Sequence, residues 1–253
     1  MDRKYLDDLA RVVTRAGVLL LENGAEVYRV EDTMYHLCES YGCSTIDSYA
    51  TPSLLIISFT LDGELSHNVK RVRMKSINLD KVDKVNDLSR RVTKEHMSLE
   101  DLSHELSLIE DKKPYSHKIT ILGACISSIG FAYAFGGGLM EQIYAGMVGI
   151  IIRSIVIIFS GTSMDGFFKN VVCGFVLTAL GVMLQSKGMC NGEVVISAVI
   201  MLLVPGLAIT NAIRDSINGD LNSSVLRFIE AIFIAISIGL GSGIAYFLLR
   251  GVQ

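Results

Sequence analysis

The second half of this 253-residue sequence contains few charged residues. Residues 118–253 hold only 7 of the 23 Lys and Arg residues and 6 of the 26 Asp and Glu residues. No soluble core stays apolar over so long a stretch. The charge distribution therefore predicts a polar domain at residues 1–116 followed by a membrane domain at residues 117–253. The net charge of −3 gives no indication of a nucleic-acid partner.

Sequence signals of catalysis, metal binding and nucleotide binding are also missing. The glycines of the polar part are isolated, so no phosphate-binding loop and no ATP site are expected. The histidines of this part lack the spacing of metal ligands, and the 5 cysteines form neither a CxxC pair nor a zinc pattern. We therefore expect a protein that is not an enzyme, with no cofactor or metal and with inert thiols in a reducing compartment.

A cleavable signal peptide is not expected, because residues 1–15 are polar and helical and lack a short apolar segment. The N-terminal domain should therefore stay in the cytosol. Apolar periodicity predicts helices over residues 6–20 and 27–41, then strands over 44–49, 54–61 and 67–74 with a hairpin at Asp62-Gly63. Asn78 and Ser98 are candidate caps for two further helices. The result is a small α+β domain of the order α-α-β-β-β-α-α.

The apolar second half divides into five candidate spans, at residues 118–139, 143–160, 167–184, 194–213 and 225–249. Lys and Arg near the span ends place the N-terminus inside and the C-terminus outside. The predicted fold class is an α+β cytoplasmic domain followed by an all-α five-helix transmembrane domain. Small residues four apart in the first and last spans favour tight intrachain packing, a partner subunit or oligomer, or both.

The fourth span is interrupted in its middle by Pro205 and Gly206. Proline lacks an N–H and clashes with the carbonyl of Met201, so the helix must open there. In lipid, opened backbone is tolerated only where protein or a wet cavity receives it, and broken helices are typical of transporter binding sites. Two interpretations stay open: a substrate site, or a kink in a structural helix.

Arg153 lies within the second span. A guanidinium there costs roughly 2.5–3.5 kcal/mol on insertion scales, so it should face a wet cavity or a counter-charge. It is either an anion-binding residue or one partner of a structural ion pair, with Glu230 or Asp215 as the other.

A second set of polar residues surrounds the end of the fourth span and the start of the polar domain. Asn211 could offer amide hydrogen bonds to a substrate. The remaining residues are candidates for coupling or gating, or alternatively for capping and ion pairing. They are Glu26, Arg29, Glu31, Arg214, Asp215, Asp220 and Glu230.

Two separated motifs resemble a known family. Residues 17–33, GVLLLENGAEVYRVEDT, are similar to the opening motif of the bacterial threonine/serine exporter family. The stretch from Leu203 to Gly206, with residues 211–215 and Gly219-Asp220, resembles its membrane motif. The resemblance implies export of threonine and serine or, as in a two-subunit relative, of succinate. It also implies a bacterial inner-membrane location and, because the chain matches only the first part of longer members, a second small membrane subunit.

The function expected from these observations is that of a subunit of a secondary exporter for small carboxylate metabolites, driven by an ion or substrate gradient. The substrate-binding residues would be Arg153, Pro205, Gly206 and Asn211, with the dipole of the half-helix that starts at Gly206 directed at a carboxylate. The alternative is a membrane-anchored sensor or scaffold whose cytoplasmic domain binds a regulatory ligand or protein. The choice between an amino acid and a dicarboxylate stays open.

Overall fold

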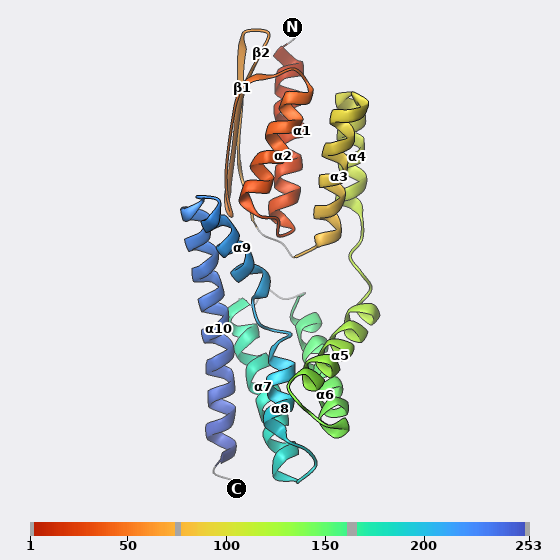
Figure 1. Ribbon diagram of the computed structural model, residues 1–253, viewed down its shortest axis with the longest axis vertical. Coiled ribbons are helices and arrows are strands. Elements are labelled where there is room, and N and C mark those ends of the chain that lie inside the picture. Colours follow the sequence, from red (N-terminus) through yellow and green to blue (C-terminus); the bar gives the residue numbers. More distant parts are fainter. Residues whose placement is uncertain (1–2, 74–76, 161–165, 251–253) are drawn as a thin grey trace. The chain divides into compact units, whose positions relative to one another are not determined.

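The computed structural model of the chain describes residues 3–73, 77–160 and 166–250 (Figure 1). The described chain forms two compact units: unit 1 contains Met1–Pro114 and Leu207–Phe228, and unit 2 contains Tyr115–Gly206 and Ile229–Gln253. The elements are, in chain order, α1 (Arg3–Glu22), α2 (Val27–Ser40), β1 (Ser44–Thr51), β2 (Leu54–Leu61), β3 (Glu64–Arg71), α3 (Leu79–Glu95), α4 (Leu99–Asp111), α5 (His117–Ala134), α6 (Leu139–Ser160), α7 (Gly166–Ser186), α8 (Gly192–Ile200), α9 (Gly206–Ile217) and α10 (Leu221–Arg250).

The predicted fold class is wrong. The described residues are mostly helical, with ten helices and one sheet of three strands. Only three of these helices are long and apolar enough to cross a membrane, at Leu139–Ser160, Gly166–Ser186 and Leu221–Leu249. An α+β domain followed by five membrane-spanning helices is therefore not what the described chain forms.

Two of the five predicted spans, at residues 118–139 and 194–213, do not form a helix long and apolar enough to cross a membrane. Residues 194–213 are divided between α8, of 9 residues, and α9, of 12 residues. At about 1.5 Å per residue, neither can cross a hydrocarbon layer of about 30 Å. The helix of the first candidate span, α5, has 18 residues and ends at Ala134, before the run of glycines at 136–138. The sequence stays apolar beyond the ends of these helices, so apolar composition alone overestimates the length of a continuous helix.

Unit 1 combines the sheet with helices from both of its chain segments. The observed order of the elements up to α4 is the order predicted for residues 1–116. The strands form an antiparallel sheet in the order β1-β2-β3, and the hairpin turn at Asp62 and Gly63 has positive φ at both residues. The side chains of Asn78 and Ser98 accept from backbone N–H groups and cap α3 and α4, as predicted. Residue 74, the predicted end of β3, lies outside the described residues.

The core of unit 1 lies between one face of the sheet and α1 and α2. Alternate residues of β2, namely Leu55, Ile57 and Phe59, are fully buried. Gly17 of α1 lies so close to this layer that an added Cβ would come within 2.5 Å of the Met34 sulfur and 2.6 Å of a Leu55 methyl. Small size at position 17 therefore allows α1 to approach both α2 and the sheet.

Unit 2 is held together by close contacts at glycines. A Cβ at Gly192 would come within 2.2 Å of the carbonyl oxygen of Gly181, so α7 and α8 touch through their backbones. On α10, a Cβ at Gly241 would come within 2.0 Å of the carbonyl oxygen of Val171 in α7. Such contacts are how helices associate in lipid, where burial of apolar surface supplies no driving force. The close contact of α10 is at Gly241 and not at Gly239 or Gly243, the pair whose spacing suggested packing, since nothing lies within 4 Å of a Cβ at either of these two residues.

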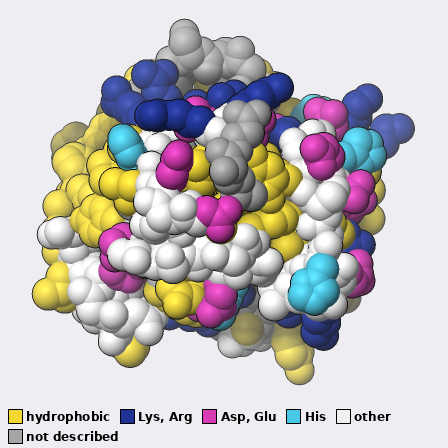
Figure 2. Space-filling model, turned by 90° about the horizontal axis from the view of Figure 1, so that it is seen from above, with side chains coloured by type: hydrophobic (Ala, Val, Ile, Leu, Met, Phe, Trp, Pro, Cys, Tyr) yellow, Lys and Arg dark blue, Asp and Glu magenta, His cyan; other side chains and the backbone are white. Residues whose placement is uncertain are grey.

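The surface differs between parts of the chain. Figure 2 shows a face on which acidic, basic and histidine side chains lie among apolar ones. By contrast, large apolar side chains are exposed along much of α10, including Phe233, Leu240 and Phe247. Exposed apolar side chains on a helix of membrane-spanning length are suited to contact with lipid.

Candidate functional sites

The turn between α1 and α2 leaves backbone groups without helical partners. α1 ends at Glu22 and α2 begins at Val27, and Gly24 between them has φ 94°, which glycine adopts without a Cβ clash. Glu26 precedes α2, but its side chain does not cap the helix. The carbonyls of Gly24 and Ala25 and the N–H of Val27 therefore need partners from elsewhere in the chain.

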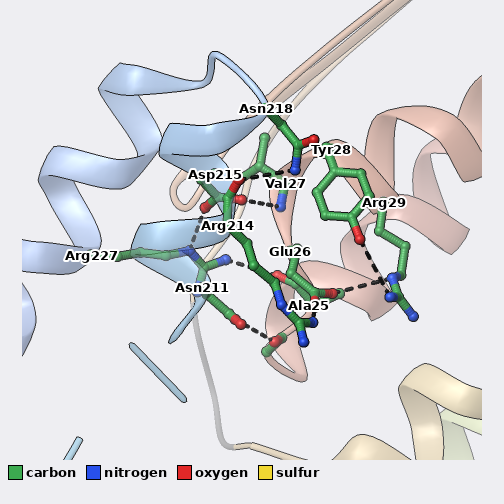
Figure 3. Close-up of polar contacts among 11 residues, drawn as sticks. Ala25, Glu26, Val27, Tyr28, Arg29, Asn211, Arg214, Asp215, Asn218 and Arg227 are labelled. Atoms are coloured by element: carbon green, nitrogen blue, oxygen red, sulfur yellow. Dashed lines mark hydrogen bonds and ion pairs between the residues drawn. The ribbon is translucent and has the colours of Figure 1, made fainter. Parts of the chain in front are cut away.

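Side chains from the second segment of unit 1 supply these partners (Figure 3). Nδ2 of Asn211 in α9 donates to the carbonyl of Gly24 at 2.9 Å. A guanidinium nitrogen of Arg227 in α10 donates to the carbonyl of Ala25 at 2.8 Å. The turn is therefore held by residues 187 and 202 positions away in the sequence. The Asp215 cluster is defined here as Gly24, Ala25, Glu26, Val27, Asn211, Arg214, Asp215 and Arg227.

Asp215 is the central residue of this cluster. Its Oδ1 accepts from the N–H of Val27 at 3.1 Å, so Asp215 caps α2 from a distant part of the chain. Its Oδ2 lies 3.2 Å from Nε of Arg227, and the two side chains are 0% and 3% exposed. Burial raises the pKa of Asp215, while Arg227 and the Val27 N–H oppose that rise. Burying two charges is costly, and the additional hydrogen bonds to the turn offset part of that cost.

Glu26 connects the cluster to α2. One of its carboxylate oxygens pairs with Arg214 of α9, and the other lies 3.2 Å from Nε of Arg29. Burial alone would raise the pKa of Glu26, but its own backbone N–H, Arg214 and Arg29 outweigh that effect and lower it. Glu26 is therefore a shared carboxylate held between two guanidinium groups.

Glu31, about one helical turn further along α2, has a raised pKa. The N–H of Ala50 in β1 donates to Oε1 of Glu31 at 2.7 Å. Burial raises the pKa of Glu31 to about 6, opposed by the Ala50 N–H and reinforced by the negative charges of Asp220 and Asp215. Burial also raises the pKa of Asp220, whose N–H donates to the carbonyl of Asp215 at 2.8 Å. Glu31 is thus a half-buried carboxyl group that titrates close to physiological pH.

Most of the residues selected for coupling or gating meet in unit 1. The sequence identified them as polar groups near apolar segments and as candidates for ion pairing. It did not identify their backbone partners, which are the N–H of Val27 for Asp215 and the N–H of Ala50 for Glu31. Arg227 was also not selected as a site residue. Its signal was present, since it is a charged residue inside a long apolar helix, as Arg153 is. The functional roles of these residues stay predictions.

A second candidate site is a cavity of about 380 Å³ in unit 2, which we call the Arg153 cavity. Nε of Arg153 is buried and has no hydrogen-bond partner among the described residues. The polar neighbours are Thr120 and Ser127 from α5 and Asn170 from α7. The apolar part of the wall consists of Ala124, Ile152, Val156, Leu202 and Leu203. The cavity can therefore offer a positive charge and neutral hydrogen-bonding groups to a small ligand.

The helix interruption borders this cavity. α8 ends at Ile200, and the N–H groups of Leu202 and Leu203 bond to carbonyls three residues back, as in a tightened last turn. Pro205 follows, and α9 begins at Gly206. The break that the sequence predicted at Pro205 and Gly206 is thus observed, and Leu202 and Leu203 bring it to the cavity wall.

Glu230 lies in a different environment from Asp215. It lines a cavity of about 670 Å³ in unit 2 with Lys169 and Asn170. Asn170 and Val156 line both this cavity and the Arg153 cavity. Asp215 pairs instead with Arg227, so Asp215 is not the counter-charge of Arg153. Throughout the described ranges, no group of three or more His, Cys, Asp or Glu residues is arranged to hold a metal ion.

Comparison with known proteins identifies a family. Residues 11–249 match the family described as “Putative threonine/serine exporter”. The chain is 23% identical, over 95% of its length and 93% of the relative, to a protein of Klebsiella aerogenes named as a probable succinate transporter subunit. It is 22% identical to a probable threonine/serine exporter of Mycobacterium tuberculosis, covering 99% of this chain and 46% of that protein. It is also 22% identical to a threonine/serine exporter of Corynebacterium glutamicum, of which it covers 52%. No solved structure matches the chain significantly.

Proposed function

The chain belongs to the threonine/serine exporter family, and from this premise we propose that it is a subunit of a secondary exporter for small carboxylate metabolites, with the Arg153 cavity as the substrate site. Members of the family are transporters and not enzymes, and the apolar helices of this chain suit a membrane protein. The candidate substrates are threonine, serine and succinate, after the names of the relatives.

The observation that carries the proposal is that Arg153 lines a cavity and that its buried Nε has no hydrogen-bond partner among the described residues. A guanidinium within a helix of membrane-spanning length is costly and is retained where it faces a cavity or a counter-charge. A planar guanidinium binds a carboxylate through two parallel hydrogen bonds. Thr120, Ser127 and Asn170 are suited to bind the remaining polar groups of a metabolite.

The helix break has a supporting role in this proposal. Pro205 prevents a continuous helix, and α9 begins at the next residue, Gly206. The break keeps Leu202 and Leu203 at the cavity wall, where a continuous helix would direct them differently. Asn211, which donates to the carbonyl of Gly24, is assigned to holding the turn between α1 and α2 rather than to contacting substrate.

The remaining parts of the proposal concern assembly and energy. A relative of nearly the same length is named as a transporter subunit, which supports a second membrane subunit as partner. We infer a cytoplasmic N-terminus from the Lys and Arg residues near the span ends, and an external C-terminus because three crossings place the termini on opposite sides. Export would be driven by a gradient of an ion or of the substrate, with the carboxylates of the Asp215 cluster and Glu31 as candidates for coupling or gating.

The test is efflux of labelled threonine, serine and succinate from preloaded cells that express the chain with its partner. Arg153→Lys and Arg153→Gln should both reduce efflux, by about 10-fold or more, because a charged hydrogen bond contributes about 1.5–3 kcal/mol. Lysine should not restore transport, since a point charge does not replace a planar fork. Lys187→Gln is the matched control, because Lys187 is exposed and outside the cavity.

The outcome that contradicts the proposal is efflux at the wild-type rate in Arg153→Gln, at wild-type protein level. That result would favour the alternative in which the chain is a membrane-anchored sensor or scaffold. Binding of labelled substrate to the purified chain, measured in parallel, separates loss of the site from loss of the partner subunit.

A further inference from the structure

A second ligand site is suggested by a groove in unit 1, between α2 and α3. The groove has a volume of about 550 Å³. This volume lies within the range of about 300–1,000 Å³ that is usual for small-molecule sites. The groove shares no lining residue with the Arg153 cavity, and it is built entirely from the polar first part of the chain.

The groove carries an excess of positive charge. Arg29 from α2 and Arg90 and Lys94 from α3 line it, whereas Asp32 is the single carboxylate among its lining residues. Asp32 lies 3.3 Å from His36, which also lines the groove. The pair of Arg90 with Asp87 is long, at 3.8 Å, and both side chains are about two-thirds exposed, so it neutralises little of the guanidinium charge.

Neutral polar groups accompany these charges. The Tyr28 hydroxyl and the Asn86 amide line the same groove, together with the Ser89 and Thr93 hydroxyls, which donate to backbone carbonyls of α3. Guanidinium and ammonium groups combined with hydroxyl and amide donors are the usual partners of phosphate oxygens. A single carboxylate would leave part of the donor capacity of Arg29, Arg90 and Lys94 unused. The chemistry therefore favours a ligand with at least one phosphate group.

We propose that the groove between α2 and α3 binds a phosphate-bearing small molecule and that Arg29 links this site to the Asp215 cluster. Arg29 is shared between two neighbours. Its Nε lies 3.2 Å from one carboxylate oxygen of Glu26, and the other oxygen of Glu26 pairs with Arg214 of α9 (Figure 3). A phosphate in the groove competes with Glu26 for Arg29.

The competition between Glu26 and phosphate for Arg29 predicts a change in phosphate affinity when Glu26 is replaced. Glu26 holds Arg29 in an existing ion pair, so its removal should release the guanidinium and tighten phosphate binding. By linkage, phosphate binding should weaken the hold of Arg29 on Glu26 to the same degree. A ligand in the groove would thus act on Glu26, which also pairs with Arg214 of α9. The groove is independent of the substrate site proposed above.

The experiment uses the full chain in nanodiscs of phosphatidylcholine, titrated with inorganic pyrophosphate by calorimetry. The variant Arg90→Gln/Lys94→Gln should weaken binding by about tenfold or more, since each lost contact is a charged hydrogen bond. Glu26→Gln should tighten binding several-fold. Lys84→Gln is the control, because Lys84 also lies on α3 but does not line the groove.

Two results would overturn the proposal: the absence of pyrophosphate binding to the wild-type chain, or an equal loss of affinity in Lys84→Gln and in the groove variant. Unchanged affinity in Glu26→Gln would overturn the link through Arg29. A second arm identifies the source of the phosphate. If nanodiscs that contain phosphatidic acid abolish pyrophosphate binding, the ligand is a lipid headgroup; if the affinity is unchanged, it is a soluble metabolite. Because no transport is measured, failure here is distinguishable from failure of the exporter proposal.

Discussion

At the scale of single residues, Asp215 combines two tasks that are usually separate. It caps α2 through the N–H of Val27, and it neutralises the buried Arg227. Its side chain performs both tasks while fully buried, and this burial raises its pKa despite a cationic neighbour. An aspartate chosen only for helix capping would not need a buried arginine.

The first prediction concerns this pair. Arg227→Met should destabilise the chain strongly, by about 3–5 kcal/mol, because it leaves the Asp215 charge buried without a partner. In Asp215→Asn/Arg227→Met the charge is removed, and the amide oxygen can still accept from Val27, so much of the loss should be recovered. Thermal unfolding of the purified chain measures both variants. A double variant that is no more stable than Arg227→Met would show that the charge of Asp215 is not the cause.

The second prediction concerns pH and Glu31. Because the pKa of Glu31 is raised from 4.5 to about 6, its protonated form stabilises the fold below pH 4.5, and this contribution is lost as the pH rises to about 6. Glu31→Gln keeps an acceptor for the Ala50 N–H but cannot ionise. It should reduce the fall in stability over this window, leaving the contributions of Asp215 and Asp220, whose pKa values are also raised, and it should unfold at a higher temperature than wild type at pH 7.

Glu26 does not obscure that measurement. Its pKa is lowered from 4.5, so its contribution is lost only as the pH falls below that value. The exposed Glu39 of the same helix provides the matched control, and the slopes between pH 4.5 and 6 are compared between Glu39→Gln and Glu31→Gln. An unchanged slope in Glu31→Gln would assign the pH dependence to another group.

Residue-level reasoning from sequence found charged groups but not the backbone atoms they bind. Arg214 and Asp215 stood out because they follow an apolar segment. Gly24 and Ala25, whose carbonyls accept from Asn211 and Arg227, carry no polar side chain, so nothing in the sequence marks these carbonyls as acceptors. A contact between residues almost 190 positions apart, with one partner in the backbone, has no sequence signature.

At the scale of elements, local signals predicted the polar part well. Turn residues and caps act over three or four positions, and the hairpin at Asp62-Gly63 and the caps at Asn78 and Ser98 are all observed. Membrane crossing depends instead on an uninterrupted length of apolar helix. Pro205 was recognised as a break, but its consequence, two helices too short to cross alone, was not drawn in counting spans.

The third prediction compares two glycines on α10. Gly241→Val should destabilise unit 2 by about 1–3 kcal/mol or more, since the new side chain would overlap the carbonyl oxygen of Val171. Gly239→Val introduces the same side chain two residues earlier, where nothing lies within 4 Å, and should change stability by no more than about 0.5 kcal/mol. Both are measured by thermal unfolding in detergent. Equal effects would show that the cost arises from the helix itself and not from packing.

At the scale of the whole molecule, the N-terminal residues and Leu207–Phe228 belong to one compact unit. The candidate span Leu221–Leu249 has 29 residues, which at about 1.5 Å per residue exceeds a hydrocarbon thickness of about 30 Å. Its first two turns can therefore lie outside the bilayer. The membrane boundary predicted between residues 116 and 117 stays a prediction.

The fourth prediction concerns the whole chain and follows from this unit. A cysteine at Asn222 and one at Arg11, each placed in a background without native thiols, should lie on the same side of the membrane. With the N-terminus inside, an impermeant maleimide should spare both in intact cells and label both after permeabilisation. Labelling of position 222 alone in intact cells would contradict the placement of residues 207–228 with the N-terminal part.

The composition of unit 1 also determines when it can be completed during synthesis. The turn at Gly24 and Ala25 leaves the ribosome early, but Asn211, Asp215 and Arg227 follow only after residues 115–206 have been made. At about 5–20 residues per second, those roughly 90 residues take about 5–20 s. During that interval α2 has no cap and the turn has no partners. A ribosome that stalls before residue 207 would therefore present an N-terminal part in which the turn and α2 lack these hydrogen-bond partners, because the partner residues have not yet been synthesised.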